Sequence, residues 1–443
     1  MNVHRGIIVS VGLGLVVGWF VVQSALTAKP ATQPAAVPAS VPVSDKCLLW
    51  KVELPGRGWN SPVVLTRDLA IFHSGGDRKI YAVARADGKP KWEFETGCAM
   101  STVALLGDKL IGLGYDKIGP VALEAASGKV LWRSKNGYDH TYAADNTLIS
   151  NSYTHNPDGL WVQRIHRLSP EDGTVVWTKK VTDYIGGSPI ARSYVSMLTA
   201  DVCLIGVGHG KDEQSLSSVM VAIDPATGKK MWAIDGINSA WFIRDGRVYV
   251  YWQQEYNRVG VTKAYDLKTG LEKKTTVTYD HDGYSQLAGD YLLSHRAFSA
   301  ELEAYDFASG KRVWHYKPRG AGEVLTKWPG LMYTSTVDRF PVAMHDGAVL
   351  LIVNDGLLAV DLKTGKPRWK FTMECTNLYG LVVRDGIAYV MDDGYPIRDQ
   401  RIKIHARRGD PPTPKSTCYL YALDLTKASQ LGVPPEYEAA TPK

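Results

Sequence analysis

The sequence is poor in cysteine, nearly balanced in charge, and without the short motifs that mark several common enzyme classes. Five cysteines stand among 443 residues, and an odd number cannot all pair within one chain. The net charge of +6 is small for this length and argues against nucleic-acid binding. There is no Ser-His-Asp spacing, no phosphate loop and no Cys-x-x-Cys motif, which argues against the corresponding hydrolase, nucleotide and redox sites.

What the chain contains instead is typical of many strands and turns. Hydrophobic residues make up 45% of the sequence and charged residues 22%, which is a globular composition. The 42 glycines, 23 prolines and 23 tyrosines favour turns and strands. The chain is too long for one ordinary sandwich and is within reach of one large repeat array.

The N-terminus carries a basic head followed by an apolar run. Residues 6–22 hold no charge, and these 17 residues are at the short limit for a helix that crosses a bilayer. We interpret residues 1–27 as a signal anchor, that is, a transmembrane helix. A cleaved signal peptide is the alternative, although Leu26 stands where its cleavage site needs a small residue. Residues 28–46 are rich in Pro and Ala and are expected to form a semi-extended linker.

One pattern, small–apolar–Asp–x–x–Thr/Ser–Gly–Lys–x–x–Trp, returns along the rest of the chain. Its clearest copies run over residues 222–232, 304–314 and 359–369. The repeat glycines are 40, 45, 55, 42, 40 and 55 residues apart. A period of about 40–50 residues without helical patterning predicts propeller blades of four strands. The tryptophans of the repeats are Trp92, Trp132, Trp177, Trp232, Trp314 and Trp369, and one copy carries Lys274 in their place.

Each part of the repeat has a physical reason. The apolar stretch is a strand, and the Asp after it accepts hydrogen bonds from backbone N–H groups in a turn. Gly supplies a positive φ where the hairpin reverses. The Trp is expected on the outer strand, where its ring covers the seam to a neighbouring blade. Asp-Gly pairs at 245–246, 346–347 and 385–386 predict a second hairpin, between the first and second strands of a blade.

Counting the strands predicts eight blades in a closed ring. Seven third strands precede their own outer strands, whereas an eighth, residues 418–424, has no Trp after it. Trp50, in contrast, stands on an outer strand that no third strand precedes. We therefore expect Trp50 to face Tyr421 and complete the last blade, which removes the open edge of a linear array. The propeller is expected to span residues 47–426, followed by a tail at 427–443.

The same pairing places the cysteines. Cys47 is expected near Asp424 and Cys418 near Glu53, about 20 Å apart along the ribbon and too far to bridge. Cys375 lies in the loop that leads into the last blade, on the same face as the start of the Cys418 strand. Cys375–Cys418 is therefore the best candidate disulfide, and free thiols are the alternative.

The repeat resembles that of the PQQ-like β-propeller family, over nearly the whole chain after the linker. That family includes quinoprotein dehydrogenases and non-enzymatic propellers such as BamB of the outer-membrane β-barrel assembly machinery. The enzymes hold their quinone against two adjacent cysteines and need a calcium or lanthanide site beside a catalytic Asp. This sequence has no Cys-Cys pair and no matching cluster of ligands, so the resemblance points to the non-enzymatic, BamB-like branch and to no cofactor.

Two sets of residues are candidate partner-binding sites. The tripeptide Tyr-Asp-His occurs twice, ending at His140 and His281, in connections that enter the inner strands of the third and sixth blades. Imidazole and carboxylate groups suit a metal or a ligand there, and turn formation is the structural alternative. A basic insertion at residues 392–417 suits an acidic partner, a phospholipid headgroup or a neighbouring subunit, and a solvated loop is the alternative. Its basic side chains include Arg401, Lys403, Arg407 and Arg408.

These observations predict an all-β, eight-bladed propeller tethered to the bacterial inner membrane by one N-terminal helix. The basic head places the propeller in the periplasm, and a secreted or periplasmic protein after signal cleavage is the alternative. The expected function is a protein–protein interaction scaffold or accessory subunit of an envelope complex, with other protein subunits as partners and no nucleic acid. The alternatives are a PQQ-dependent dehydrogenase and a ligand- or carbohydrate-binding sensor module.

Overall fold

A computed structural model describes most of the chain between residues 46 and 434. The described residues are 46–54, 63–74, 78–97, 100–114, 119–155, 161–188, 190–210, 217–237, 240–253, 259–274, 278–280, 284–295, 302–317, 342–353, 356–372, 378–392 and 418–434. The chain divides into two compact units, Met1–Ser40 and Val41–Lys443, and all described residues lie in the second. Within these ranges no helix has the length and apolar character that a bilayer crossing needs.

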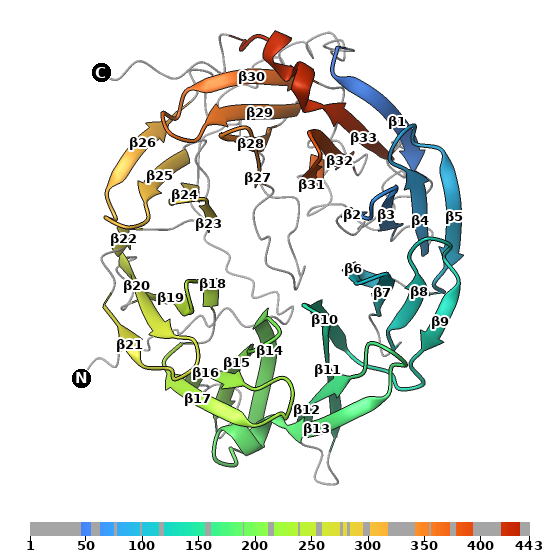
Figure 1. The fold of residues 1–443 in the computed structure, drawn as a ribbon. Coiled ribbons are helices and arrows are strands. Elements are labelled where there is room, and N and C mark those ends of the chain that lie inside the picture. Colours follow the sequence, from blue (N-terminus) through green and yellow to red (C-terminus); the bar gives the residue numbers. More distant parts are fainter. Residues whose placement is uncertain are drawn as a thin grey trace, which may run out of the picture. The chain divides into compact units, whose positions relative to one another are not determined.

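The described strands form eight antiparallel sheets that follow one another around a ring, so the predicted eight-bladed propeller is confirmed (Figure 1). Blade 1 contains β2 (Val64–Leu65), β3 (Leu69–Ser74), β4 (Lys79–Ala84) and β5 (Pro90–Glu95). Blade 2 contains β6 (Met100–Leu106), β7 (Lys109–Gly114), β8 (Val121–Glu124) and β9 (Val130–Arg133). Blade 3 contains β10 (His140–Ala144), β11 (Thr147–His155), β12 (Trp161–Leu168) and β13 (Val175–Lys180), followed by the 3-10 helix η1 (Val181–Tyr184). Blade 4 contains β14 (Ile190–Leu198), β15 (Cys203–Gly210), β16 (Ser217–Ile223) and β17 (Lys230–Asp235).

The other four blades continue the ring with the same strand order. Blade 5 contains β18 (Ala240–Arg244), β19 (Arg247–Gln253), β20 (Val259–Asp266), β21 (Glu272–Lys273) and β22 (Thr278–Asp280). Blade 6 contains β23 (Tyr284–Ala288), β24 (Tyr291–His295), β25 (Leu302–Asp306) and β26 (Arg312–Tyr316). Blade 7 contains β27 (Val342–His345), β28 (Ala348–Val353), β29 (Gly356–Asp361) and β30 (Pro367–Thr372). Blade 8 contains β31 (Leu378–Arg384), β32 (Ile387–Asp392), β33 (Cys418–Asp424) and β1 (Leu48–Leu54), and the 3-10 helix η3 (Leu425–Gln430) follows β33.

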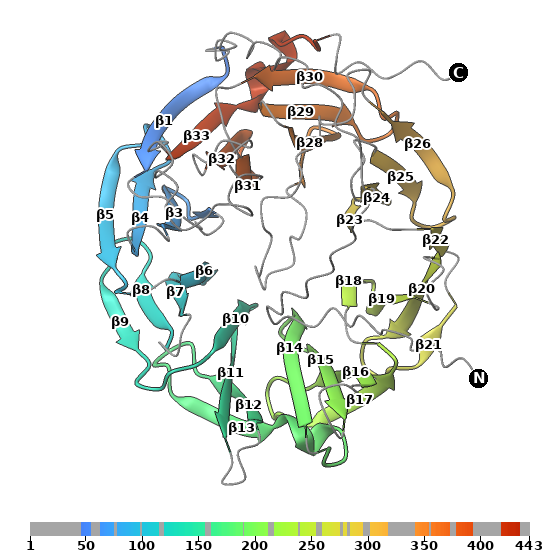
Figure 2. The same ribbon diagram turned by 180° about the vertical axis from the view of Figure 1, so that it is seen from behind.

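The last blade is built from both ends of the propeller, as the sequence predicted. The sheet order is β1-β33-β32-β31, and Figure 2 shows β1 along the outer side of β33. The predicted partner of Trp50 is wrong by one residue, because Trp50 lies opposite Ala422 and Lys51 lies opposite Tyr421. The reason is a β-bulge at Leu49, which adds one residue to the outer strand and shifts the register.

The cysteines of this blade follow the observed register. The Asp424 N–H donates to the Cys47 carbonyl at 2.7 Å, so the two residues are neighbours, as expected. Cys418 lies opposite Leu54 and not opposite Glu53, because the bulge moves every later pair by one residue. Cys47 and Cys418 are both buried.

The Asp-x-x-Thr-Gly turn has the hydrogen bonds that its chemistry predicts. In blade 4, the Asp224 carboxylate accepts a hydrogen bond from the Thr227 hydroxyl at 2.7 Å and one from the Ala226 N–H at 2.7 Å. The Thr227 hydroxyl is the main reason why the pKa of Asp224 is held below its usual value. Gly228 follows at φ +69°, in the left-handed region, and closes the hairpin.

The repeat tryptophans bridge one blade to the next. The indole Nε1–H of Trp132 in blade 2 donates to the Pro170 carbonyl of blade 3 at 3.0 Å, and the ring packs over Gly173. A Cβ on Gly173 would lie 2.6 Å from the Trp132 ring, so glycine alone fits without displacement. The same pairing of ring and glycine joins Trp50 to Gly88, Trp92 to Gly128, Trp177 to Gly228, Trp232 to Gly270, and Trp314 to Gly365.

The seam between blades 7 and 8 departs from this arrangement. The helix η3 stands in blade 8 where the other blades have the glycine turn. Trp369 of blade 7 is buried in the same apolar cluster as Leu425 and Ala428 of that helix. A short helix with a small residue therefore takes the place of the glycine beneath this Trp.

The seam between blades 5 and 6 has no Trp. The outer strand of blade 5 lacks the bulge, so that Lys273, and not the predicted Lys274, lies opposite Ala264. Phe307 of blade 6 fills the seam, and its ring centroid lies 5.7 Å from that of Phe242 and 5.1 Å from that of Tyr249. An aromatic cluster replaces the indole here.

Candidate functional site

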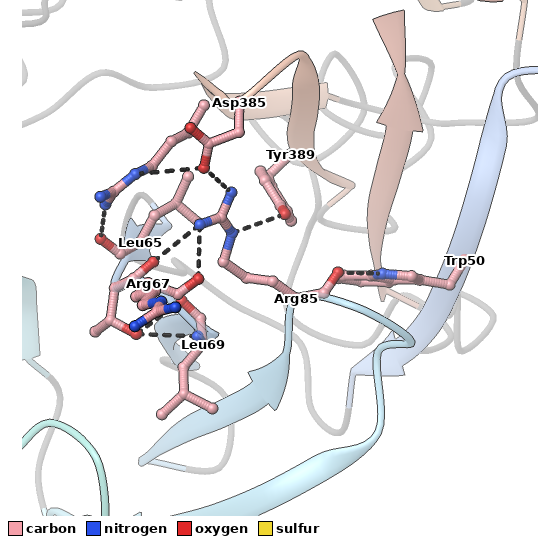
Figure 3. Close-up of polar contacts among 9 residues, drawn as sticks. Trp50, Leu65, Arg67, Leu69, Arg85, Asp385 and Tyr389 are labelled. Atoms are coloured by element: carbon pink, nitrogen blue, oxygen red, sulfur yellow. Dashed lines mark hydrogen bonds and ion pairs between the residues drawn. The ribbon is translucent and has the colours of Figure 1, made fainter.

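The seam that closes the ring, between blades 8 and 1, is held by a buried arginine. Arg85 stands in the turn after β4, and only 8% of its surface is exposed. Its Nε–H donates to the Tyr389 hydroxyl of blade 8 at 3.0 Å, and its Nη2 pairs with the Asp385 carboxylate at 2.8 Å (Figure 3). Its Nη1 donates to the carbonyls of Thr66 and Arg67 at 3.1 and 2.8 Å. One guanidinium group therefore joins segments about 300 residues apart in sequence.

Trp50 reaches the same place from a third segment. Its Nε1–H donates to the Arg85 carbonyl at 2.9 Å, and its ring centroid lies 6.0 Å from that of Tyr389 (Figure 3). The hydrogen bond from Arg85 is the main reason why the pKa of the Asp385 carboxyl is below its usual value. We call Trp50, Arg85, Asp385 and Tyr389 the ring-closing cluster. It fixes the circular frame on which any binding surface of the propeller depends.

A second buried polar group surrounds the predicted site residue His140, in blade 3. His140 is the first residue of β10 and lies opposite Asn151 of β11. Asn151 is 2% exposed, and its side-chain oxygen has no hydrogen-bond partner within the described part of the chain. Burial lowers the pKa of His140, against the opposing effect of the Asp139 charge, which favours a neutral imidazole at pH 7.

The residues before His140 have structural contacts. The Asp139 carboxylate accepts the Tyr153 N–H at 2.7 Å, and the buried Tyr138 ring lies 5.1 Å from the His166 ring. These contacts agree with the structural alternative, in which the Tyr-Asp-His tripeptide forms a turn and does not bind a ligand. The predicted second residue, His281, lies outside the described residues, so a site shared by the two histidines stays a prediction.

Gln163 links blade 3 to blade 4 beside this group. Its side-chain amide donates to the Ser193 carbonyl at 2.8 Å and to the Tyr153 hydroxyl at 2.9 Å, and its oxygen accepts the Ser193 N–H. Burial raises the pKa of Tyr153 to about 12, so that the phenol stays protonated. The amide thus imitates a backbone pairing between two separate sheets.

The partly buried ring of His166, on the same blade, is expected to lower the free energy of unfolding at acid pH. Its Nε2 lies 2.8 Å from the Ser152 hydroxyl and its Nδ1 lies 3.0 Å from the Thr178 hydroxyl. Burial, and to a lesser degree the Arg164 charge, lowers the pKa of His166 to about 4. An unfolded histidine titrates near pH 6.5, so the unfolded state binds the extra proton between these two values. The folded state therefore loses stability as the pH falls from about 6.5 to about 4.

The variant His166→Gln has no titrating group at this position and tests the effect. We expect the wild-type protein to lose roughly 1–2 kcal/mol more unfolding free energy than the variant between pH 7 and pH 4.5, after allowance for solvent screening of a partly exposed ring. Urea unfolding followed by circular dichroism at the two pH values measures this difference. Equal losses in both proteins would contradict a depressed histidine pKa.

The basic insertion predicted to bind a partner lies outside the described residues, except for its first residue, Asp392, which ends β32. This holds for Arg401, Lys403, Arg407 and Arg408, whose role stays a prediction. Cys375 also lies outside, and its disulfide with Cys418 stays a prediction for the same reason.

Comparison with known proteins supports the propeller fold. The similar proteins include both an assembly factor and a dehydrogenase. A family model described as outer membrane protein assembly factor BamB matches residues 41–135 and 119–316. The crystal structure of BamB from Moraxella catarrhalis is 13% identical, with a TM-score of 0.51 over 84% of this chain and 98% of that chain. A europium-containing methanol dehydrogenase is 14% identical, with a TM-score of 0.52 over 85% of this chain and 93% of that chain. At these identities the structural likeness establishes the fold alone.

A curated relative with local sequence similarity is an enzyme. The lanthanide-dependent methanol dehydrogenase of Methylorubrum extorquens is 30% identical over 115 residues, which are 26% of this chain and 18% of that protein. The match therefore spans less than a fifth of the dehydrogenase, and its activity does not transfer with it.

The adjacent cysteine pair that holds the quinone in such enzymes has no counterpart in this sequence. No two of the five cysteines are adjacent in the sequence, so the ring of a cysteine pair cannot form. Across the described ranges no three His, Cys, Asp or Glu side chains are grouped to hold a metal ion. The family model, in contrast, covers residues 41–316 as a whole, which is more than half of the 443-residue chain. The chain therefore belongs to the PQQ-repeat propeller family described as outer membrane protein assembly factor BamB.

Proposed function

We propose that this protein is a non-enzymatic scaffold of the bacterial envelope. In this proposal the N-terminal helix tethers it to the inner membrane, and the propeller docks other protein subunits of an envelope complex in the periplasm. One observation carries the proposal: seven of the nine large hydrophobic side chains that are exposed in the described part lie on or beside the outer strands of the blades. These seven are Leu49, Val130, Leu131, Val175, Val176, Leu271 and Val313. They lie on blades 2, 3, 5, 6 and 8, and exposed apolar side chains on outer strands suit contact with another protein.

The buried polar groups support a rigid frame. The ring-closing cluster and the Gln163 link both join neighbouring blades, and each fills a seam with hydrogen bonds instead of opening it to a ligand. Membership of a family described as an assembly factor supports a role in the envelope. The local similarity to dehydrogenases keeps a PQQ-dependent enzyme as the alternative. A ligand- or carbohydrate-binding sensor is the third candidate.

Affinity purification of the tagged full-length chain from native membranes, in mild detergent, tests the proposal. We expect the chain to sediment with membranes and to bring down one or more envelope proteins in fixed stoichiometry, without a bound chromophore. A preparation that contains no partner, carries a quinone absorbance and reduces a dye with alcohol as substrate would instead establish the dehydrogenase alternative. Binding on a glycan array, without a protein partner, would favour the sensor.

A further inference from the structure

The outer strand of each blade except blade 5 contains a β-bulge just before its Trp or equivalent residue. The extra residue of the bulge is Lys91, Leu131, Val176, Met231, Val313, Arg368 or Leu49, in blades 1, 2, 3, 4, 6, 7 and 8 respectively. A charged residue at such a position protects an exposed edge from unwanted pairing, and blades 1 and 7 have one. The other five bulges carry an apolar residue, which does not protect the edge in this way.

Blades 2 and 3 depart furthest from the protected pattern. In both, the bulge residue and the residue before it are apolar and exposed: Val130 by 43%, Leu131 by 45%, Val175 by 41% and Val176 by 55%. In blade 6, by comparison, the exposed Arg312 precedes Val313. Figures 1 and 2 show β9 and β13 on the outside of two adjacent blades. We call these four residues the blade 2–3 rim.

The backbone beside the rim is also available for pairing. β9 and β13 are each the last strand in their sheet order, so their outer edges pair with no described strand. Such an edge presents a row of N–H and C=O groups that an extended peptide satisfies by adding one more strand. Specificity then comes from the side chains at alternate positions of the added strand.

The charges that flank the rim are mostly positive. Five basic side chains lie on or next to β9 and β13, and within the described part none of them forms an ion pair: Lys129, Arg133, Lys135, Lys179 and Lys180. Of the neighbouring acidic groups, one is paired with a lysine, and two accept hydroxyl hydrogen bonds and keep their charge. Glu171 pairs with Lys109 at 2.8 Å, Asp172 accepts the Thr174 hydroxyl at 2.8 Å, and Glu124 accepts the Ser127 hydroxyl. The surface therefore complements a negatively charged partner.

We propose that the blade 2–3 rim binds an extended segment of a partner protein in which apolar residues alternate with Asp or Glu. The segment adds to the outer edge of β9 or β13, its apolar side chains cover the rim, and its carboxylates meet the flanking lysines and arginine. This inference rests on the proposed scaffold function and names its docking surface and the chemistry of its partner.

Site-specific photocrosslinking of the full chain tests the proposal. Benzoylphenylalanine in place of Val176 is irradiated in the native membrane, and the same probe in place of Arg368, at the bulge of blade 7, is the matched control. We expect the Val176 probe to crosslink to one acidic, apolar segment of another protein, identified by mass spectrometry, and the Arg368 probe to give no such product. Crosslinking to a second copy of this chain, or to lipid, would overturn the proposal.

A pair of lysine variants separates this inference from the proposed function. Leu131→Lys with Val176→Lys gives blades 2 and 3 the residue type of blade 1, and Val313→Lys is the control in blade 6. We expect the double variant to lose at least tenfold of the co-purified partner, while the control keeps it and both retain the wild-type melting temperature. Full recovery with the double variant refutes the rim and leaves the scaffold function standing. No partner with the wild-type chain refutes both.

Discussion

Replacing Arg85 with methionine is expected to lower the free energy of unfolding by about 3 kcal/mol. The methionine retains apolar volume but leaves the Thr66 and Arg67 carbonyls and the Tyr389 hydroxyl without their donor in the ring-closing seam. Each buried group that loses its partner costs on the order of 1–3 kcal/mol, whereas Asp385, whose side chain is 68% exposed, adds little. Equilibrium unfolding in urea measures the loss.

Lys89 provides a control in the same turn. It pairs with Asp87 at 2.8 Å, but its side chain is 77% exposed, so Lys89→Met is expected to leave stability nearly unchanged. Arg85→Lys keeps the charge but offers no planar fork, and should restore only part of the loss. Equal stabilities for the Arg85→Met and Lys89→Met variants would show that the ring closes without the arginine.

The architecture could be predicted because each repeat position is set by local chemistry. Asp224 closes its own turn, Gly228 has the positive φ that the turn needs, and both facts depend on a few adjacent residues. The pairing of the Trp50 strand with the last blade could also be predicted. The Trp50 strand lacks a preceding third strand, and the third strand at residues 418–424 lacks a following Trp strand, so each supplies what the other lacks. No distant contact had to be known in advance.

The register could not be predicted in the same way. The bulge at Leu49 inserts one residue, and a bulge is a backbone feature that leaves hydrophobic alternation almost unchanged. The same shift occurs in blade 7, where the blade 8 register would be sought by analogy, since a bulge at Arg368 places Trp369 opposite Ala359. When the same bulge occurs in several blades, a comparison of one blade with another does not reveal the one-residue shift in strand register.

The buried polar links depend on segments that the sequence does not connect. Arg85 is a charged residue inside a repeat turn, and that irregularity was an available signal, but its partner Tyr389 lies 304 residues away. Gln163 had no such signal, because an amide in a strand reads as an ordinary exposed position. His140 was expected in the connection that enters the inner strand of blade 3 and is instead the first residue of that strand, whereas its neighbour Asn151 follows only from the observed pairing of β10 with β11.

Gly173→Ala is expected to cost about 3 kcal/mol, because two separate penalties add. The φ of +72° costs an L-residue about 1 kcal/mol, and a methyl group 2.6 Å from the Trp132 ring must displace it, at about 1–3 kcal/mol. Gly246→Ala isolates the first penalty, since Gly246 has φ +68° and no atom lies within 4 Å of the added Cβ. The difference between the two losses in urea unfolding measures the contact alone.

A double-mutant cycle then assigns that difference to the indole. Trp132→Ala removes the ring from the seam and is expected to cost about 4 kcal/mol by itself, but it also removes the obstacle to a methyl group at Gly173. In the Trp132→Ala background, Gly173→Ala should therefore cost no more than Gly246→Ala does in the wild-type protein. If it costs as much as before, the glycine is required by the turn and not by the Trp. Because the same ring and glycine meet at six seams, the result decides whether the blades of this propeller are joined by one repeated contact or by their separate cores.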